Sequence, residues 1–447
     1  MESLDYIMDL GSPVLMPITF IILGLIVRIP FKDAFKSGLM VGIGFIGLSI
    51  TVEFMIESLT PITIIIVEKF NLSLTVLDIG WPAAAAIAMG TKIGIFIVPL
   101  CIFINIIMLY TRTTRVLNVD IWNLWHHAVT GSLVAFMSSS FSLGLFAAAI
   151  NCILTMIIAD RTAKDVSETL GLANISIPHG FAVSFVPIAW LVNYVFDRTP
   201  IISGIKINIY TLQGKFSVLN DPGTLGAIIG ALLAVSAGAD IKTILNTAMT
   251  MAAVMLIIPR MAKILMEGVY PISKQIQTLV QTRLTYFNSI TIGLDAAVSV
   301  GHPVTLTISL FMIPVILFLA AIVPGNQFLP FASLTGLPFA FVLVTAVCRG
   351  DVFRTLITAI ITLTTSLYFA TNLAPLMTSV ARSNYFTIPD NATSISSIDY
   401  AGALLPWGIV RMFESNIIAI LAVTLGTLTL MYINYRLLQK EDVDYKE

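Results

Sequence analysis

The chain has 447 residues, of which 57% are hydrophobic and 11% are charged, and its mean hydropathy is +0.94. Soluble domains carry about 25% charged residues, so this composition excludes a soluble protein and indicates a chain that crosses a membrane several times. The formal net charge of −1 and the lack of basic runs give no sign of a nucleic-acid partner.

Uncharged windows of about 20 residues predict membrane-spanning helices, because a helix of that length crosses the hydrocarbon layer. The acidic N-terminus MESLDYIMDLG lacks the basic start of a cleaved signal peptide, so we expect the first window to remain as a span. Eleven spans are predicted, at about 10–27, 37–59, 83–111, 121–137, 140–159, 222–239, 249–269, 296–323, 330–348, 355–375 and 415–435. The expected fold class is an all-α polytopic membrane protein, with residues 1–447 forming one integral membrane domain.

Lysine and arginine are enriched on the cytoplasmic side of membrane proteins. In this chain they gather after the first, third, fifth and last windows, at 28–36, 112–115, 161–164 and 436–440. All four clusters lie on one side if the N-terminus is outside the cell and the C-terminus is cytoplasmic.

Two parts of the chain resemble each other. FKDAFKSGL…FMIESLTPIT (31–63) aligns with IKTILNTAM…ILMEGVYPIS (241–273), and DIGWPAA (78–84) with TIGLDAA (291–297). Positive residues precede the span in the first copy and follow it in the second, which favours inverted repeats at about 31–111 and 241–323. Inverted repeats are typical of transporters and place the substrate site at their interface. Chance similarity between apolar segments is the alternative.

The stretch ISIPHGFAVSFVP (175–187) contains His179 in an uncharged region. If residues 172–196 crossed the membrane fully, the two repeats would have the same orientation, so we predict a re-entrant segment that leaves 198–220 in the cytoplasm. Proline and glycine in this stretch suit a broken backbone, which is tolerated at membrane depth where it is buried in protein or lines a wet cavity. His179 is therefore expected to face a polar cavity.

Asp295 ends the second repeat's IGLD motif, and His302 follows it. No charged residue occurs from 296 to 348, and a carboxylate at the centre of a span costs about 3 kcal/mol. Asp295 is therefore expected either in a functional cavity or at an interface as a helix cap. His302, in SVGHPVT, equally fits the opening of the next helix.

A second polar cluster lies in WNLWHHAVTG (122–131). Trp122 and Trp125 also fit an aromatic belt at the membrane interface, while His126, His127 and Thr130 continue inward. Together with Trp81, these side chains and one carboxylate would offer neutral hydrogen-bonding groups and a flat apolar face. This inventory favours a polyol or sugar ligand.

No metal or cofactor is predicted. Cys101, Cys152 and Cys348 lie in apolar runs without a Cys-x-x-Cys pair, as expected of small core residues. The HExxH and GxGD signatures of intramembrane enzymes are also absent from the sequence.

Seven motifs together resemble the galactitol-type membrane component, enzyme IIC, of the bacterial phosphotransferase system, whose wider superfamily includes ascorbate permeases. They are GIGFIG (42–47), DIGWP (78–82), TRVLNVDIWNLWH (114–126), IPHG (177–180), IGLD (292–295), VPGNQFLPF (323–331) and RGDVFRTLI (349–357). The resemblance covers about residues 1–437. It implies a homodimer in the bacterial cytoplasmic membrane, an elevator-like moving domain, and a phosphocysteine on a separate IIB protein as the phosphoryl donor.

The resemblance also implies the substrate-binding residues. These are Trp81, Pro82, His126, His127, Thr130, His179, Gly180 and Asp295, with Trp125, His302 and Asn326 as further candidates. No P-loop or phosphocysteine motif occurs in the chain, so we expect IIA and IIB to be separate proteins that receive phosphate through HPr.

The expected mechanism is inward translocation of a polyol, galactitol or a related alditol, coupled to its phosphorylation by phospho-IIB. His179 and Asp295 are the candidate bases for the reacting hydroxyl. An ion-coupled secondary transporter of a small polar solute is the alternative, because it would share the inverted repeat.

Overall fold

The computed structural model describes residues 12–70, 74–199, 222–283, 290–384, 386, 388 and 394–444, and most of them are helical. The α-helices in these ranges are α2 (Ser12–Ile26), α3 (Phe31–Phe70), α4 (Gly80–Met89), α5 (Lys92–Tyr110), α6 (Trp125–Ser138), α7 (Phe141–Leu170), α8 (Gly180–Asp197), α11 (Pro222–Ala237), α12 (Ile241–Arg283), α13 (Pro303–Ile322), α14 (Leu337–Val347), α15 (Val352–Ser383), α16 (Leu404–Ser415) and α17 (Ile417–Asp444). The short 3₁₀ helices are η1 (Trp122–Leu124), η3 (Ala296–Ser299) and η4 (Ala332–Gly336).

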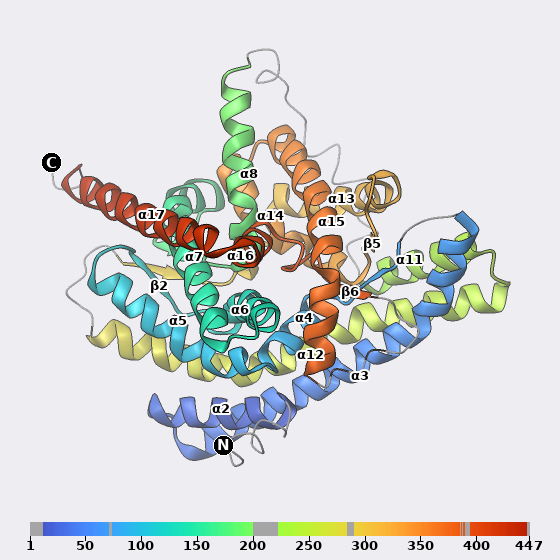
Figure 1. Cartoon of the computed structure of the whole chain (residues 1–447), viewed down its shortest axis with the longest axis horizontal. Helices are drawn as coiled ribbons and strands as arrows, with labels where there is room; N and C mark the ends of the chain where they lie inside the picture. Colours follow the sequence, from blue (N-terminus) through green and yellow to red (C-terminus); the bar gives the residue numbers. More distant parts are fainter. Residues whose placement is uncertain are drawn as a thin grey trace.

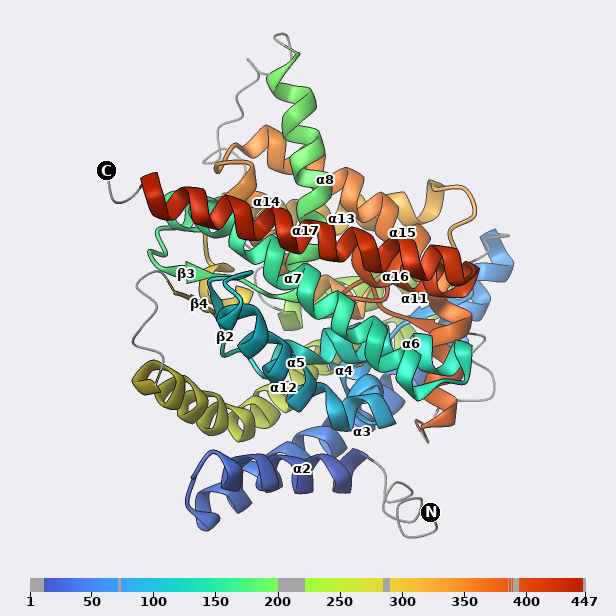
Figure 2. The ribbon, with the colours of Figure 1, turned by 60° about the vertical axis from the view of Figure 1, so that its left-hand side comes forward.

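The helices form two groups (Figure 1). In the first group α3 packs against α2, α11 and α12, and the two long helices α3 and α12 run along one side of the molecule (Figures 1 and 2). The second group contains the shorter helices, with α17 lying across α7 and α16 at their outer surface (Figure 2). α4 contacts α3 as well as α5 and α6, and so lies where the groups meet.

Short strands connect the helices of the second group. They are β1 (Val76–Asp78), β2 (Val116–Asn118), β3 (Ile175–Ser176), β4 (Thr291–Gly293), β5 (Phe328–Leu329) and β6 (Ser394–Ser396). β1 lies between β5 and β6, and β4 lies between β2 and β3, with every pairing parallel. Each sheet therefore takes its central strand from one half of the chain and its two outer strands from the other half.

Several predicted spans are interrupted in the structure. The window 83–111 is divided into α4 and α5 at Thr91, whose hydroxyl accepts a hydrogen bond from the Gly94 N–H (3.1 Å) and contacts Ser132 Oγ (2.7 Å). These polar contacts cap α5 and satisfy groups freed by the break. The predicted break between 137 and 140 is also present, because α6 ends before Ser139 and α7 begins after Ser140.

Two predicted spans are only the middle parts of longer helices. The window 37–59 lies inside the 40-residue α3, and 249–269 lies inside the 43-residue α12. At 1.5 Å per residue α3 is about 60 Å long, roughly twice the thickness of the hydrocarbon layer. Helix formation continues through the charged residues that flank each window, which hydropathy does not show. The crossing of the membrane by these two windows stays a prediction.

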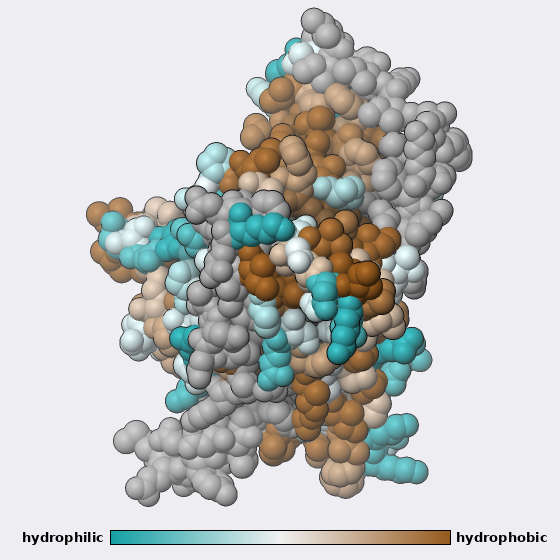
Figure 3. Space-filling view, turned by 90° about the vertical axis from the view of Figure 1, so that its right-hand side faces the viewer, coloured by the Kyte–Doolittle hydropathy of each residue, from teal (hydrophilic) through white to brown (hydrophobic). Residues whose placement is uncertain are grey.

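The described residues contain six helices that are long and apolar enough to span a membrane, as judged by length and composition. They are Lys92–Tyr110, Phe141–Leu170, Gly180–Asp197, Pro303–Ile322, Val352–Ser383 and Ile417–Glu441. Large apolar side chains cover much of the surface, and Figure 3 shows a broad hydrophobic area on one face. The prediction of a polytopic, helical membrane protein is confirmed at this level.

The stretch around His179 changes from strand to helix as its proline and glycine suggest. β3 ends at Ser176, the chain turns at Pro178, and α8 begins at Gly180 and continues unbroken past Pro187. The return of this segment to its own side of the membrane stays a prediction. The segment 198–220, predicted to be cytoplasmic, lies almost entirely outside the described residues.

Candidate functional site

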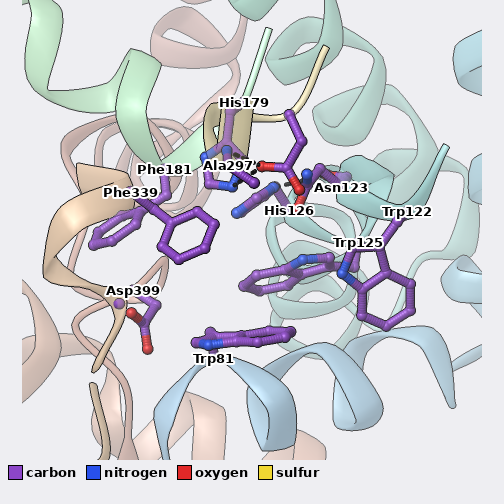
Figure 4. Close-up of a pocket in the computed structure, with 12 residues that line it drawn as sticks. Trp81, Trp122, Asn123, Trp125, His126, His179, Phe181, Ala297, Phe339 and Asp399 are labelled. Carbon is purple, nitrogen blue, oxygen red and sulfur yellow. Dashed lines mark hydrogen bonds and ion pairs between the residues drawn. The ribbon is translucent and has the colours of Figure 1, made fainter. Parts of the chain in front are cut away.

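A cavity of about 110 Å³ lies at the centre of the second group of helices (Figure 4). Each of the six short strands is followed, within two to seven residues, by a residue that lines it. The lining residues are Trp81, Trp122, Asn123, Trp125, His126, His179, Phe181, Asp295, Ala297, Gly336, Phe339 and Asp399. The strands thus bring six separate stretches of chain to one point.

His179 and Asp295 form one polar part of the cavity. His179 Nε2 lies 3.7 Å from Asp295 Oδ1, so a ligand hydroxyl placed beside the pair can contact both atoms, and both side chains are largely buried. His179 precedes α8, and its Nδ1 accepts a hydrogen bond from the Ala182 N–H (3.4 Å). A neutral imidazole that accepts at Nδ1 carries its proton on Nε2, so His179 presents a donor toward Asp295.

Asp295 precedes the short helix η3, as His179 precedes α8. Its Oδ1 accepts a hydrogen bond from the Ala297 N–H (3.0 Å), which caps the short helix. Asp295 is therefore a helix cap that also lines the cavity, and its role in binding stays a prediction.

His126 has the opposite tautomer. Its Nδ1 lies 2.7 Å from the carbonyl oxygen of Asn123, and because a carbonyl only accepts, Nδ1 must carry the proton. Nε2 is then an acceptor, and it is buried without a hydrogen bond among the described residues. The ring stacks on Trp125 at 4.0 Å and lies edge-on to His179 at 4.7 Å between centroids.

Aromatic rings form most of the remaining wall. Figure 4 shows the indoles of Trp81, Trp122 and Trp125 on one side and the two histidines on the other. Trp81 and Trp122 meet edge to face at 6.5 Å, and Phe339 stacks near His179 at 5.9 Å. Such rings offer flat apolar faces to the C–H groups of a ligand.

Asp120 lies near this cavity in the connection between α5 and α6, outside both helices. Burial, together with the nearby charge of Asp295, raises the pKa of its carboxyl to about 8, although hydrogen bonds from Asn123 act in the opposite direction. Burial and the neighbouring Asp295 therefore both disfavour a second full negative charge at Asp120.

Five of the eleven predicted site residues line the cavity: Trp81, Trp125, His126, His179 and Asp295. The other six do not line it, and their roles in binding stay predictions. They are Pro82, His127, Thr130, Gly180, His302 and Asn326.

These six residues have other surroundings. Thr130 accepts a hydrogen bond from Asn151, which also donates to Tyr400. Asn326 donates to the carbonyls of Ala320 and Phe328 and so holds the loop before β5.

Gly180 and His302 stand at the starts of helices. Gly180 packs against His126, and a Cβ at this glycine would lie 2.7 Å from the His126 Cβ. His302 precedes α13 without forming a side-chain cap.

His127 faces a different cluster. Its ligand atom and those of Cys101 and Cys152 lie within 4.8 Å of one another in the buried region behind α6. Zinc usually takes four ligands, and this cluster supplies three, so we assign no metal to it.

Sequence reasoning did not select Asn123, Phe181, Ala297, Gly336, Phe339 or Asp399, and it left Trp122 as a possible belt residue. Asn123 and Trp122 belong to the polar cluster that was recognised, so their proximity to His126 was a usable signal. Gly336, Phe339 and Asp399 reach the cavity only through the parallel pairing of β1 with β5 and β6. No local pattern in the sequence indicates that pairing.

A polytopic fold whose broken segments enclose a small cavity of histidines, a carboxylate and aromatic faces defines a membrane permease for a small polar solute. Residues 6–392 match the family model of the phosphotransferase system (PTS) sugar-specific permease component, EIIC-GAT. The chain belongs to this family of sugar permeases, which confirms the resemblance seen in its motifs. Family membership also means a sugar substrate and cooperation with a IIB component.

Relatives of known name extend over nearly the whole chain. A protein of Escherichia coli (strain K12), provisionally named a permease IIC component, is 38% identical over 93% of this chain and 95% of its own length. The PTS system galactitol-specific EIIC component of the same strain is 36% identical over 92% of this chain and 91% of its own length. Its counterpart in Escherichia coli O157:H7 matches to the same extent.

Proposed function

We propose that this protein is the membrane component of a galactitol-type phosphotransferase permease, which binds galactitol or a related alditol in the cavity of Figure 4. The observation that carries the proposal is the combination of the His179–Asp295 pair with the aromatic wall. The 36% identity to galactitol-specific relatives supports the same substrate class.

The cavity suits an uncharged, hydroxyl-rich molecule. Each hydroxyl donates one hydrogen bond and accepts others, so it can accept from His179 Nε2–H and donate to Asp295 or to His126 Nε2. The C–H side of an alditol would lie against the indole of Trp81. The cavity lining includes no lysine or arginine among the described residues, so it lacks the strong positive charge that an anionic sugar acid favours.

The proposed reaction transfers a phosphoryl group from the cysteine of phospho-IIB to an alditol hydroxyl. The P–S bond breaks as the O–P bond forms, the cysteine leaves as a thiolate, and the hydroxyl proton passes to a base on this chain. Phosphoryl transfer depends mainly on positioning and on stabilising charge, with an aspartate often accepting the proton. We assign that role to Asp295 and the donor role to His179, because His179 Nδ1 is engaged by the α8 backbone.

The proposal includes a bacterial cytoplasmic membrane location, a homodimer, separate IIA and IIB proteins supplied through HPr, and an elevator-like movement. Eleven spans and a cytoplasmic C-terminus also belong to it. The division of the helices into two groups agrees with an elevator in which one part moves and the other stays fixed. The exchange of central strands between the two halves of the chain supports the inverted repeat.

The experiment that tests this function uses purified protein in liposomes. Bound radiolabelled galactitol is measured first, and galactitol phosphate is then measured after adding the matching IIB, IIA, HPr, enzyme I and phosphoenolpyruvate. We expect saturable binding and phosphorylation that depends on IIB. Asp295→Asn should retain binding within about tenfold but lower phosphorylation by about 100-fold.

Two results would contradict the proposal. Concentrative uptake driven by an ion gradient without IIB would identify a secondary transporter instead. A lack of binding to every alditol tested would remove the substrate class.

A further inference from the structure

Asp399 is a buried carboxyl that the mechanism above does not use. Its side chain is 1% exposed and lines the cavity. It follows β6 and lies beyond residue 392, where the match to the family model ends.

The two oxygens of Asp399 differ. Oδ2 accepts a hydrogen bond from Ser397 Oγ at 3.1 Å. Oδ1 is buried and accepts no hydrogen bond of standard geometry among the described residues, although the backbone N–H of Trp81 and the hydroxyl of Ser333 interact with the carboxyl. A buried polar atom without a hydrogen bond destabilises the folded protein, so its presence in a cavity points to a partner supplied by a ligand.

The neighbouring Asp78 shows what a structural carboxyl looks like in this region. It is fully buried and receives hydrogen bonds from Gly80 N, Phe331 N, and both the N–H and the hydroxyl of Ser333. These bonds tie β1 to the loop after β5. Asp78 does not line the cavity, so the two aspartates have different surroundings although they lie close together.

Oδ1 of Asp399 packs directly against Gly336. A Cβ at Gly336 would lie 2.1 Å from Asp399 Oδ1, which is closer than atoms can approach. Gly336 has an ordinary negative φ of −83°, so its backbone does not require glycine. The lack of a side chain there instead keeps the carboxyl able to reach the cavity.

Asp399 corresponds to His179 in the arrangement of the strands. β3 ends at Ser176 and β6 ends at Ser396, and each pairs in parallel with the central strand of its own sheet. His179 and Asp399 each lie three residues beyond those ends. In Figure 4 Asp399 lies beside Trp81 and away from His179, with Phe339 between them.

We propose that Asp399 binds a second hydroxyl of the substrate, at the opposite end of the cavity from the reacting hydroxyl, and so selects alditols by length and configuration. The inference rests on the proposed function. A ligand hydroxyl can donate to Oδ1 if the carboxyl is ionised, and can accept from it if the carboxyl is protonated. With His179 and Asp295 at one end and Asp399 at the other, the cavity recognises two separated hydroxyls across an apolar middle.

The test measures equilibrium binding of galactitol and of its monodeoxy derivatives to the purified full-length protein and to Asp399→Ala. The wild-type protein should lose affinity for the derivative that lacks the hydroxyl bound by Asp399. Asp399→Ala should bind galactitol about fivefold or more weakly and should no longer distinguish that derivative from galactitol. Asp399→Asn should restore part of the affinity.

Asp160→Ala provides the matched control. Asp160 is also buried, its oxygens accept hydrogen bonds from the Arg115 N–H and from Asn434, and it does not line the cavity. Its replacement shows what the loss of a buried carboxyl does through destabilisation alone. It should leave the ranking of the deoxy derivatives unchanged.

If Asp399→Ala fails to fold, Gly336→Ala replaces it in the test. The new alanine methyl group should displace Oδ1 of Asp399 while the Asp399 carboxyl remains in the protein. It should reduce the affinity for galactitol and abolish the same discrimination. Unchanged discrimination in the folded variant, or a uniform loss for every derivative, would overturn the inference and leave the proposed function standing. Failure of the wild-type protein to bind any alditol would overturn both.

Discussion

At the scale of single residues, the two cavity histidines have different hydrogen-bonding roles because of the backbone groups they meet. His179 Nδ1 accepts from an N–H at the start of α8, whereas His126 Nδ1 donates to a carbonyl. The nitrogen left for the ligand is a donor in the first case and an acceptor in the second. The sequence shows that both histidines lie in apolar surroundings, but the tautomers depend on the turns around them.

This assignment predicts the behaviour of His179→Gln. Glutamine retains an N–H donor but cannot take up a proton, so binding and IIB-dependent phosphorylation of galactitol should both stay within about tenfold of wild type. His179→Ala, which removes the donor, should weaken binding by about 5- to 150-fold. A fall of about 100-fold in the phosphorylation rate of His179→Gln with binding retained would instead identify His179 as the base.

Gly180 affects the site without lining it. A Cβ at this position would lie 2.7 Å from the His126 Cβ, and neither atom belongs to a flexible chain end. Gly180→Ala should therefore displace the His126 ring and cost about 1–3 kcal/mol of stability through overpacking. Galactitol binding and the thermal midpoint in detergent should both fall. Wild-type values for both would show that α8 adjusts freely.

At the scale of secondary-structure elements, the sequence predicts the apolar helices better than the connections between them. Windows of hydropathy locate α5, α7, α13 and α17 because each helix carries its own apolar surface. Strands of two or three residues such as β3 and β5 have too few positions to show a period of two. Their pairing depends on distant parts of the chain, so the cavity that they assemble was only partly predictable.

The crossing of α6 and α7 offers a test of packing at this scale. A Cβ at Gly144 would lie 2.5 Å from the Ala135 Cβ and 2.6 Å from the Gly131 carbonyl oxygen, a close approach typical of small residues between membrane helices. Gly144→Ala should lower stability by about 1–3 kcal/mol, seen as a lower midpoint of thermal unfolding in detergent.

Gly426→Ala is the control for this packing prediction. Gly426 lies in α17, and a Cβ there meets no atom within 4 Å. Alanine has the higher helix propensity, so this variant should match or exceed the wild-type midpoint. Equal midpoints for Gly144→Ala and Gly426→Ala would contradict a tight α6–α7 contact.

At the scale of the whole molecule, a prediction of the orientation in the membrane comes from where the positive clusters meet. Arg115 after α5 and Arg161 in α7 both form ion pairs with Glu441 of α17, at 2.9 Å each. Three of the four positive clusters therefore lie at one surface of the protein, although they are far apart in the sequence. The positive-inside tendency predicts that this surface is the cytoplasmic one.

This orientation predicts which positions an impermeant thiol reagent reaches in intact cells. The three native cysteines are buried, so a single introduced cysteine provides the signal. Lys164, whose side chain is 82% exposed, lies beside the Arg161 cluster, and Lys164→Cys should react only after the cells are permeabilised. Asp240 is exposed between α11 and α12, and the predicted order of spans places Asp240→Cys outside, where it should react in intact cells. Labelling of Lys164→Cys from outside would reverse the proposed orientation, whereas labelling of both or neither in intact cells would contradict the order of spans between them.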